Sequence, residues 1–261
     1  MASLPAGACC MEGYVHHGEP AGTLAKYTEF DIYVAKPSVA TDKAIVYLTD
    51  IFGMPFTNHK LIADNFAQQG FLTVVPNLFY DDHVPFPRPD NFKLPDWVQR
   101  HQPEHTEPII EKTFEFVKKE FPAITKYFSV GYCYGAKYVV RLLDEGKLNA
   151  GYIAHPSFVT EEELRTIKGP LSIAAAGILC CCSIVSQTAN DRTETDSIFP
   201  EEKRHQSETI LKEIQATYNI VLYSSVEHGF AVRGDLSNEV VTWTQETAFW
   251  QAVQWFTRFS K

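Results

Sequence analysis

Short apolar runs alternate along the chain with longer amphipathic segments. The apolar runs predict strands at residues 43–48, 71–75, 127–131, 150–154, 171–176 and 220–224. The amphipathic segments predict helices at residues 58–69, 108–120, 136–145, 201–216 and 240–256. This alternation is typical of an α/β fold, in which helices cover both faces of a mostly parallel central sheet.

The last predicted helix carries large apolar side chains at spacings of three, four and seven. These are Trp243, Phe249, Trp250, Val253 and Phe256. Such spacing predicts a helix face packed on the sheet, so we interpret these side chains as core and not as a ligand cage.

The connection from residue 77 to residue 103 is long and rich in proline. Its aromatic residues are Phe79, Tyr80, Phe86, Phe92 and Trp97. Long connections in compact domains often cover a substrate, and we expect this one to do so.

Length and charge narrow the class of protein. At 261 residues, with no convincing internal division, residues 1–261 are expected to form a single domain. The net charge of −9, without a basic cluster, argues against nucleic-acid binding and favours a small-molecule substrate. We expect no membrane association and a cytoplasmic location, because neither a signal sequence nor a long apolar run is present. The six cysteines match neither a metal site nor a disulfide framework.

Cys133 lies in the motif Gly-Tyr-Cys-Tyr-Gly, between a predicted strand and a predicted helix. This is the cysteine version of a nucleophile elbow, where small flanking residues permit a tight turn and the helix start offers peptide N–H groups. The alternative is a buried structural cysteine in a glycine-rich turn. The order of strand, turn and helix favours the nucleophile.

A nucleophilic thiol needs a base, and a histidine base needs an acid to orient it. His228 follows a predicted strand and lies after Cys133 in the chain, as in hydrolases with this elbow. His155 also follows a strand and is the second choice. Asp196, just before the helix expected near Pro200, is the candidate acid, although it could instead serve only as a helix N-terminal residue.

Taken together, these segments resemble the dienelactone hydrolase family, and its fungal members above all, over nearly the whole chain. The matching segments are residues 50–53, 131–135, 155–157, 195–200 and 228–230. The resemblance implies an α/β-hydrolase fold and a Cys133–His228–Asp196 triad. It also implies an oxyanion hole made by the backbone N–H groups of Ile51 and Tyr134. The implied reaction is hydrolysis of a small ester or lactone through an acyl-cysteine, by a monomer or homodimer without metal or organic cofactor.

Two departures concern the substrate. Bacterial members carry a glutamate that interacts with the thiol, whereas Asp50 stands here. They bind the substrate carboxylate with arginines, for which only Arg233 and Arg88 are loose candidates. Dienelactone is therefore not the substrate that the sequence singles out. The candidate pocket residues are Asp50, Phe52, Phe79, Tyr80, Arg88, Trp97, Phe230 and Arg233.

Residues 177–193 interrupt the family pattern, which resumes if they are removed. We interpret them as a retained intron translated in frame, because Gly177 can encode a GT donor and Thr193-Glu194 an AG acceptor. Residues 188–190 can encode a CTAAC branch point. The alternative is a genuine surface insertion, which loop-closure entropy tolerates. Either way, the insert can carry Asp196 away from His228 or bulge outward and leave the triad intact.

Two other functions remain open at this point. One is a small-molecule-binding homologue that has lost its triad geometry, and the other is an acyltransferase. A short distance between Asp196 and His228 favours the enzyme over the binding protein. The sequence does not separate hydrolysis from acyl transfer, which differ in what attacks the acyl-enzyme.

Overall fold

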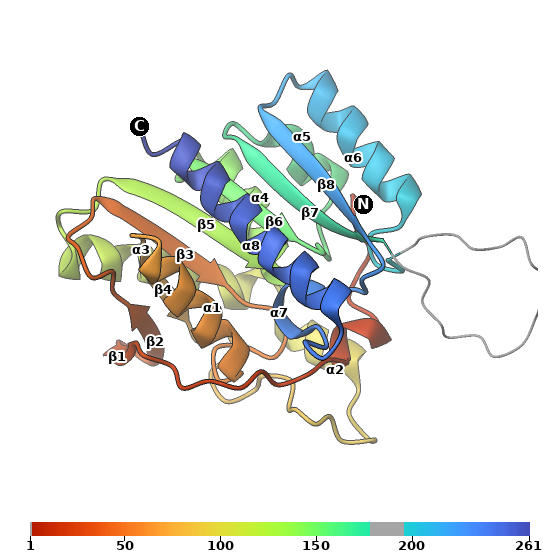
Figure 1. Ribbon diagram of the computed structural model, residues 1–261, viewed down its shortest axis with the longest axis horizontal. Coiled ribbons are helices and arrows are strands. Elements are labelled where there is room, and N and C mark those ends of the chain that lie inside the picture. Colours follow the sequence, from red (N-terminus) through yellow and green to blue (C-terminus); the bar gives the residue numbers. More distant parts are fainter. Residues whose placement is uncertain (1, 178–195) are drawn as a thin grey trace, which may run out of the picture.

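An eight-stranded sheet runs through the middle of the protein (Figure 1). The computed structural model describes residues 2–177 and 196–261. The strand order is β1-β2-β4-β3-β5-β6-β7-β8, in which β1, β2 and β4 pair antiparallel and all pairs from β4 to β8 are parallel. The strands are β1 (Thr23–Tyr27), β2 (Phe30–Ala35), β3 (Lys43–Leu48), β4 (Leu72–Pro76), β5 (Lys126–Tyr132), β6 (Ala150–Ala154), β7 (Leu171–Gly177) and β8 (Tyr218–Ser224).

The six predicted strands are confirmed as β3 to β8, with boundaries that agree within two residues. The inner ones are continuous apolar runs because helices bury both faces of a parallel sheet. Strands β1 and β2 were missed. The exposed edge strand β1 has no apolar run, and Asp31 interrupts the pattern of β2.

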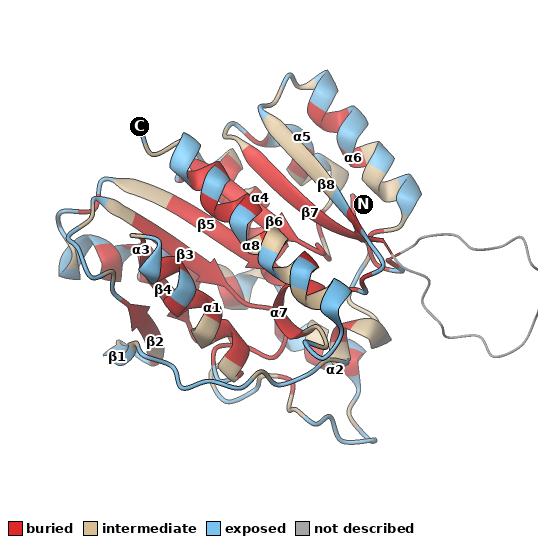
Figure 2. Cartoon of the chain, in the orientation of Figure 1, coloured by how far each residue is buried: buried red, intermediate tan, exposed pale blue. Residues whose placement is uncertain are grey.

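Helices α1 (Thr57–Gln68) and α8 (Glu239–Arg258) cover one face of the sheet (Figure 1). Helices α3 (Pro103–Glu120) and α4 (Gly135–Asp144) cover the other, and α5 (Glu161–Thr166) and α6 (Glu201–Glu213) continue that layer past α4. Smaller elements are η1 (Ala8–Met11), α2 (Leu94–Arg100) and α7 (Phe230–Arg233). The buried residues form a continuous band between the two layers (Figure 2). No helix within the described ranges is long and apolar enough to cross a membrane.

The predicted core face of α8 is partly wrong. Val253 and Phe256 are buried and Phe249 is half-buried, but Trp243 and Trp250 are 62% and 46% exposed. A helix turns by about 100° per residue, so Trp243 and Trp250 share a stripe about 100° from that of Phe249. The spacing of seven residues places the two tryptophans on the same side of the helix, but that side faces solvent and not the sheet.

The long connection at residues 77–103 packs much of its aromatic content inward. Helix α2 lies within it, and Trp97 is fully buried, with its indole N–H donating to the carbonyl of Asp82 at 2.5 Å. The Phe79 ring lies against Trp97 at 4.9 Å. These two rings therefore stabilise the connection itself, whereas Phe86 and Arg88 face the cavity described below.

The N-terminal segment crosses the carboxyl edge of the sheet and is tied down at both ends. Ser3 and Leu4 donate backbone hydrogen bonds to Val159 and Ile198. Farther along, the Tyr14 amide donates to the carbonyl of Arg233 at 3.0 Å. The turn η1, which contains Cys9 and Cys10, lies between these anchors.

A buried ion pair joins this segment to the end of β3. The guanidinium of Arg233 donates to the Asp50 carboxylate at 2.6 Å, to the Glu12 carbonyl at 2.6 Å and to the Cys9 carbonyl at 3.3 Å. The other Asp50 oxygen is 2.8 Å from Nε2 of His59. Burial raises the pKa of Asp50, but the neighbouring charges of His59 and Arg233 outweigh it, and the pKa lies below its usual value.

Asp50→Asn is expected to lower the free energy of unfolding by about 3–5 kcal/mol, because it leaves the Arg233 guanidinium buried without a counter-charge. Urea unfolding followed by tryptophan fluorescence measures the change. The matched control is Asp42→Asn, which removes an exposed partner of Lys126 and should cost under about 1 kcal/mol. Equal costs for the two variants would show that Asp50 does not hold this charge in place.

Candidate active site

The predicted catalytic side chains meet at the carboxyl edge of the sheet. Cys133 directly follows β5, and His228 lies between β8 and α7. Asp196 follows the undescribed residues after β7 and precedes α6. This edge is where parallel α/β sheets place their ligand sites.

Cys133 has the strained backbone conformation of a nucleophile elbow. Its φ is +49°, in the left-handed region that non-glycine residues rarely occupy. The flanking glycines are required by space, because a Cβ at Gly131 would lie 2.6 Å from the carbonyl oxygen of Gly135, and one at Gly135 would collide with the carbonyl of Leu48. The tight turn from β5 into α4 thus fixes the thiol at the strand end.

Asp196 and His228 form a buried pair. Oδ2 of Asp196 is 2.8 Å from Nδ1 of His228, and the other carboxylate oxygen accepts the Ile198 amide at 2.8 Å. The hydrogen bond from the Ile198 amide closes a local turn, which fixes the Asp196 carboxylate just before α6 begins. The insert has therefore not separated Asp196 from His228. Gly177 ends β7, and the rest of the insert, residues 178–193, lies outside the described residues. The structure therefore does not test the intron hypothesis.

A residue that the sequence analysis did not single out contacts both Cys133 and His228. Sγ of Cys10 is 3.5 Å from Sγ of Cys133 and 3.3 Å from Nε2 of His228. Cys133 also contacts the Ser157 hydroxyl at 3.4 Å. Cys9 and Cys10 lie in no recognisable sequence motif. The contact between Cys10 and Cys133 joins residues more than a hundred positions apart, so no local sequence pattern could predict it.

The site favours a thiolate and an imidazolium. Burial alone raises the pKa of Cys133, but a hydrogen bond with Cys10 and the charge of His228 outweigh it, so the pKa falls well below its usual value. Burial alone lowers the pKa of His228, but the charges of Asp196 and Cys133 raise it well above its usual value. A thiolate accepts hydrogen bonds and cannot donate them, so the Cys10 thiol is the donor between the two sulfurs.

His155, the second-choice base, lies beside this group with a different environment. Its ring centroid is 4.9 Å from that of His228, and burial lowers its pKa to about 4. Neither ring nitrogen meets the geometric limits for a hydrogen bond with a described residue, but the ring lies close enough to Cys133 for the thiol to raise the pKa of His155 against the larger effect of burial. Because Asp196 pairs with His228, the geometry favours His228 as the base and leaves His155 a neutral neighbour.

The backbone N–H groups of Ile51 and Tyr134 are suited to the expected oxyanion hole. Ile51 begins the turn after Asp50 at the end of β3, and Tyr134 begins the turn into α4 next to Cys133. Within residues 2–177 and 196–261, neither N–H donates to a carbonyl or a side chain. Two unpaired peptide donors near a nucleophile are what a developing oxyanion needs.

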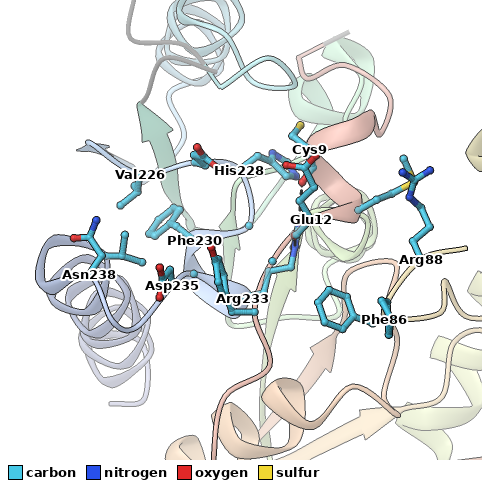
Figure 3. A pocket seen from close by; sticks show the side chains of 18 of the residues that line it. Cys9, Glu12, Phe86, Arg88, Val226, His228, Phe230, Arg233, Asp235 and Asn238 are labelled. Atoms are coloured by element: carbon cyan, nitrogen blue, oxygen red, sulfur yellow. Dashed lines mark hydrogen bonds between the residues drawn. The ribbon is translucent and has the colours of Figure 1, made fainter. Parts of the chain in front are cut away.

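A cavity of about 670 Å³ opens beside the triad (Figure 3). His228 and Cys9 reach it, whereas Cys133 and Cys10 do not line it and are fully buried. Of the predicted pocket residues, Arg88, Phe230 and Arg233 line this cavity. Phe79 and Tyr80 line a separate open depression near α2, while Asp50, Phe52 and Trp97 are buried elsewhere.

Charges are unevenly distributed around the cavity. Arg233 is held by the three acceptors described above, and Asp50 contacts Arg233 and His59 instead of the Cys133 thiol. Arg88 is exposed at the mouth and makes no ion pair with any described residue. Glu12, Glu227 and Asp235 also line the cavity. The lining thus combines three carboxylates with the side chains of Arg88, Arg233 and His228.

The donor atoms of Cys10, Cys133 and His228 lie within 4.8 Å of one another, close enough for one metal ion. Two thiolates and an imidazole are ligands typical of zinc. The pKa of Cys10 is raised well above its usual value, chiefly by its hydrogen bond with Cys133 and also by its contact with Cys9 and its burial.

Comparisons with known proteins show the family to which the chain belongs. The sequence model of the dienelactone hydrolase family matches residues 30–260. The chain is 42% identical to Hydrolase pyvD of Aspergillus violaceofuscus, over 100% of both chains. It is 31% identical to Dienlactone hydrolase 1 of Gibberella moniliformis, over 96% of this chain and 93% of the other.

Solved structures show the same fold at low sequence identity. Dienelactone hydrolase from Anabaena variabilis superposes with a TM-score of 0.61 at 12% identity, over 93% of this chain and 99% of the other. A thermophilic esterase from Thermogutta terrifontis gives 0.62 at 14% identity, over 90% and 94%. The chain therefore belongs to the dienelactone hydrolase family and is a hydrolase with the α/β-hydrolase fold.

Proposed function

We propose that this protein hydrolyses a small carboxylic ester or lactone through an acyl-cysteine on Cys133. Family membership assigns the class of carboxylic ester hydrolases. One observation carries the finer proposal: a buried Asp196–His228 pair, 2.8 Å apart, lies beside a cysteine in a strained strand-to-helix turn. No step of the proposal calls for a metal ion or an organic cofactor.

The reaction divides into two halves. The Cys133 thiolate attacks the acyl carbon, and the negative charge that develops on the carbonyl oxygen is stabilised by the N–H groups of Ile51 and Tyr134. The His228 imidazolium then protonates the leaving alkoxide. Neutral His228 next removes a proton from water, which attacks the thioester and regenerates Cys133.

Access requires movement of Cys10. Cys133 is fully enclosed, and the Cys10 sulfur occupies the position from which Nε2 of His228 would protonate a leaving group. Substrate therefore enters with displacement of η1 from the thiol. The lining combines three carboxylates with Arg88, Arg233 and His228, so its charge does not select between neutral esters and esters that carry a carboxylate.

Three competing assignments are weaker on this geometry. Sγ of Cys10 is 3.3 Å from Nε2 of His228, but the pKa of Cys10 is raised and Cys10 does not lie in a strand-to-helix elbow. A binding protein without catalysis would not need the Asp196–His228 pair. Acyl transfer uses the same acyl-cysteine and differs in its acceptor, so product analysis separates it from hydrolysis.

Cys133→Ala is expected to lower kcat/KM for p-nitrophenyl acetate by on the order of 10³-fold or more, because the variant lacks the attacking atom. Cys133→Ser should also be severely impaired. Unchanged thermal unfolding of the variants would exclude a folding defect.

Rapid acid quench of the wild type, followed by trypsin, locates the acyl group. Acetyl is expected on peptide 127–137, which contains Cys133, and not on peptide 1–26, which contains Cys9 and Cys10. An acetyl group on peptide 1–26, or full turnover by Cys133→Ala, would show that the nucleophile is not Cys133.

The pH profile tests the thiolate–imidazolium pair. The lowered pKa of Cys133 keeps the thiolate present far below the ordinary thiol value of about 8.5. The raised pKa of His228 keeps the imidazolium present above the ordinary value of about 6.5. The kcat/KM for p-nitrophenyl acetate should therefore have an acid limb well below pH 8.5 and an alkaline limb well above pH 6.5.

Asp196→Asn provides the matched control, because it removes the charge that raises the pKa of His228. Its alkaline limb should move to lower pH. An acid limb near about pH 8.5 in the wild type would mean that the thiol is not ionised in the resting enzyme.

A further inference from the structure

Cys10 takes no part in the bonds made and broken during the proposed hydrolysis, yet its sulfur is held against that of Cys133. The Sγ atoms of Cys10 and Cys133 are 3.5 Å apart, and both side chains are fully buried. The neighbouring Cys9 is half-buried, reaches the cavity and contacts the Ser197 hydroxyl at 3.4 Å. Cys10 thus contacts Cys133 directly, whereas Cys9 contacts Cys10, and its hydrogen bond with Cys10 is the main cause that lowers the pKa of Cys9 to about 6.

We propose that Cys133 and Cys10 form a redox-active pair, in which Cys133 reduces a hydroperoxide and Cys10 closes a disulfide onto it. The ligand is a hydroperoxide, either hydrogen peroxide or an organic one small enough to reach the buried thiol. This activity goes beyond ester hydrolysis and does not depend on it. The disulfide also blocks hydrolysis reversibly, because it occupies the nucleophilic sulfur.

The chemistry balances in two steps. The Cys133 thiolate attacks one peroxide oxygen, the O–O bond breaks, and the departing oxygen takes a proton, which gives a sulfenic acid and water or an alcohol. The Cys10 sulfur then attacks the sulfenic sulfur, an S–S bond forms, and hydroxide leaves and takes the Cys10 proton as water. Two thiols are oxidised by two electrons, and the peroxide is reduced by the same two.

The geometry requires only a small movement. A disulfide bond is about 2.05 Å long, so the sulfurs must approach by about 1.5 Å. Anchors on both sides keep Cys10 within reach: Leu4 bonded to Ile198, and Tyr14 bonded to Arg233. The movement displaces one turn, η1, and not an element of the sheet.

The ionisation of the two thiols suits their two roles. The pKa of Cys133 is lowered, which makes it the thiolate that attacks the peroxide. The pKa of Cys10 is raised, so it remains a thiol with a proton to release in the second step. Ser157, 3.4 Å from Cys133, offers a hydroxyl beside the reacting sulfur.

The test treats the reduced full-length protein with one equivalent of hydrogen peroxide, blocks remaining thiols with iodoacetamide and digests with trypsin without reductant. The sequence places the cysteines on three separate peptides, 1–26, 127–137 and 169–192. The expected product is peptide 1–26 linked to peptide 127–137, with the loss of two free thiols per chain. Dithiothreitol should return both thiols.

Cys9→Ser and Cys10→Ser form a matched pair at adjacent positions. Cys9→Ser should form the same linked peptide as the wild type. Cys10→Ser should not, and when a second equivalent of hydrogen peroxide is added its Cys133 should advance from sulfenic to sulfinic acid, which dithiothreitol does not reduce. In the wild type, p-nitrophenyl acetate hydrolysis lost to peroxide should return with dithiothreitol, whereas in Cys10→Ser it should stay lost.

Three results would overturn the proposal: no linkage of peptides 1–26 and 127–137, linkage of peptide 127–137 to peptide 169–192 instead, or a linked peptide that persists in Cys10→Ser. The peptide and thiol measurements need no ester turnover. A protein that forms the disulfide but hydrolyses no ester would refute the proposed function alone, and one that hydrolyses esters without the disulfide would refute this inference alone.

Discussion

The contact between Arg233 and Asp50 determines how the site is put together. It joins the end of β3 to the turn α7, and the same guanidinium holds the backbone of η1 through Glu12 and Cys9. A buried guanidinium is stable only with acceptors around it, so these segments are obliged to meet. The position of Cys10 against Cys133 follows from this requirement, because Cys10 lies between the backbone groups that Arg233 holds.

The charge of each group in the site depends on the charge of its neighbour. Asp196 stabilises charged His228, which stabilises the Cys133 thiolate, and Cys10 donates its proton toward that thiolate. Each member is buried, so water does not screen these interactions as it would at a surface. A thiolate prepared in this way is nucleophilic toward any electrophile that reaches it, and an acyl carbon and a peroxide oxygen are two examples. In both proposed reactions, the electrophile has to pass the cavity and η1 before it reaches Cys133.

Local sequence signals predicted much of this site. The runs that became β3 to β8 are apolar because both sheet faces are covered, and that signal is local. Cys133 was singled out because a strand-to-helix elbow needs glycines on either side of the central residue. Asp196 and His228 were singled out by their positions after Cys133 in the chain, and the structure places them 2.8 Å apart. Cys10 was missed because its contact depends on a buried arginine far along the chain. The exposed tryptophans of α8 were misassigned because spacing alone does not say which stripe faces the sheet.

The anchoring of the N-terminal segment has a consequence for the order of assembly. Its partners Val159, Ile198 and Arg233 lie in the second half of the chain. During synthesis, the bond from Tyr14 to Arg233 therefore cannot form until α7 has left the ribosome. Until then, Cys133 lacks both His228 and Cys10. The reactive sulfur acquires its charge and its cover only when the sheet is already complete, so the growing chain carries no activated thiol.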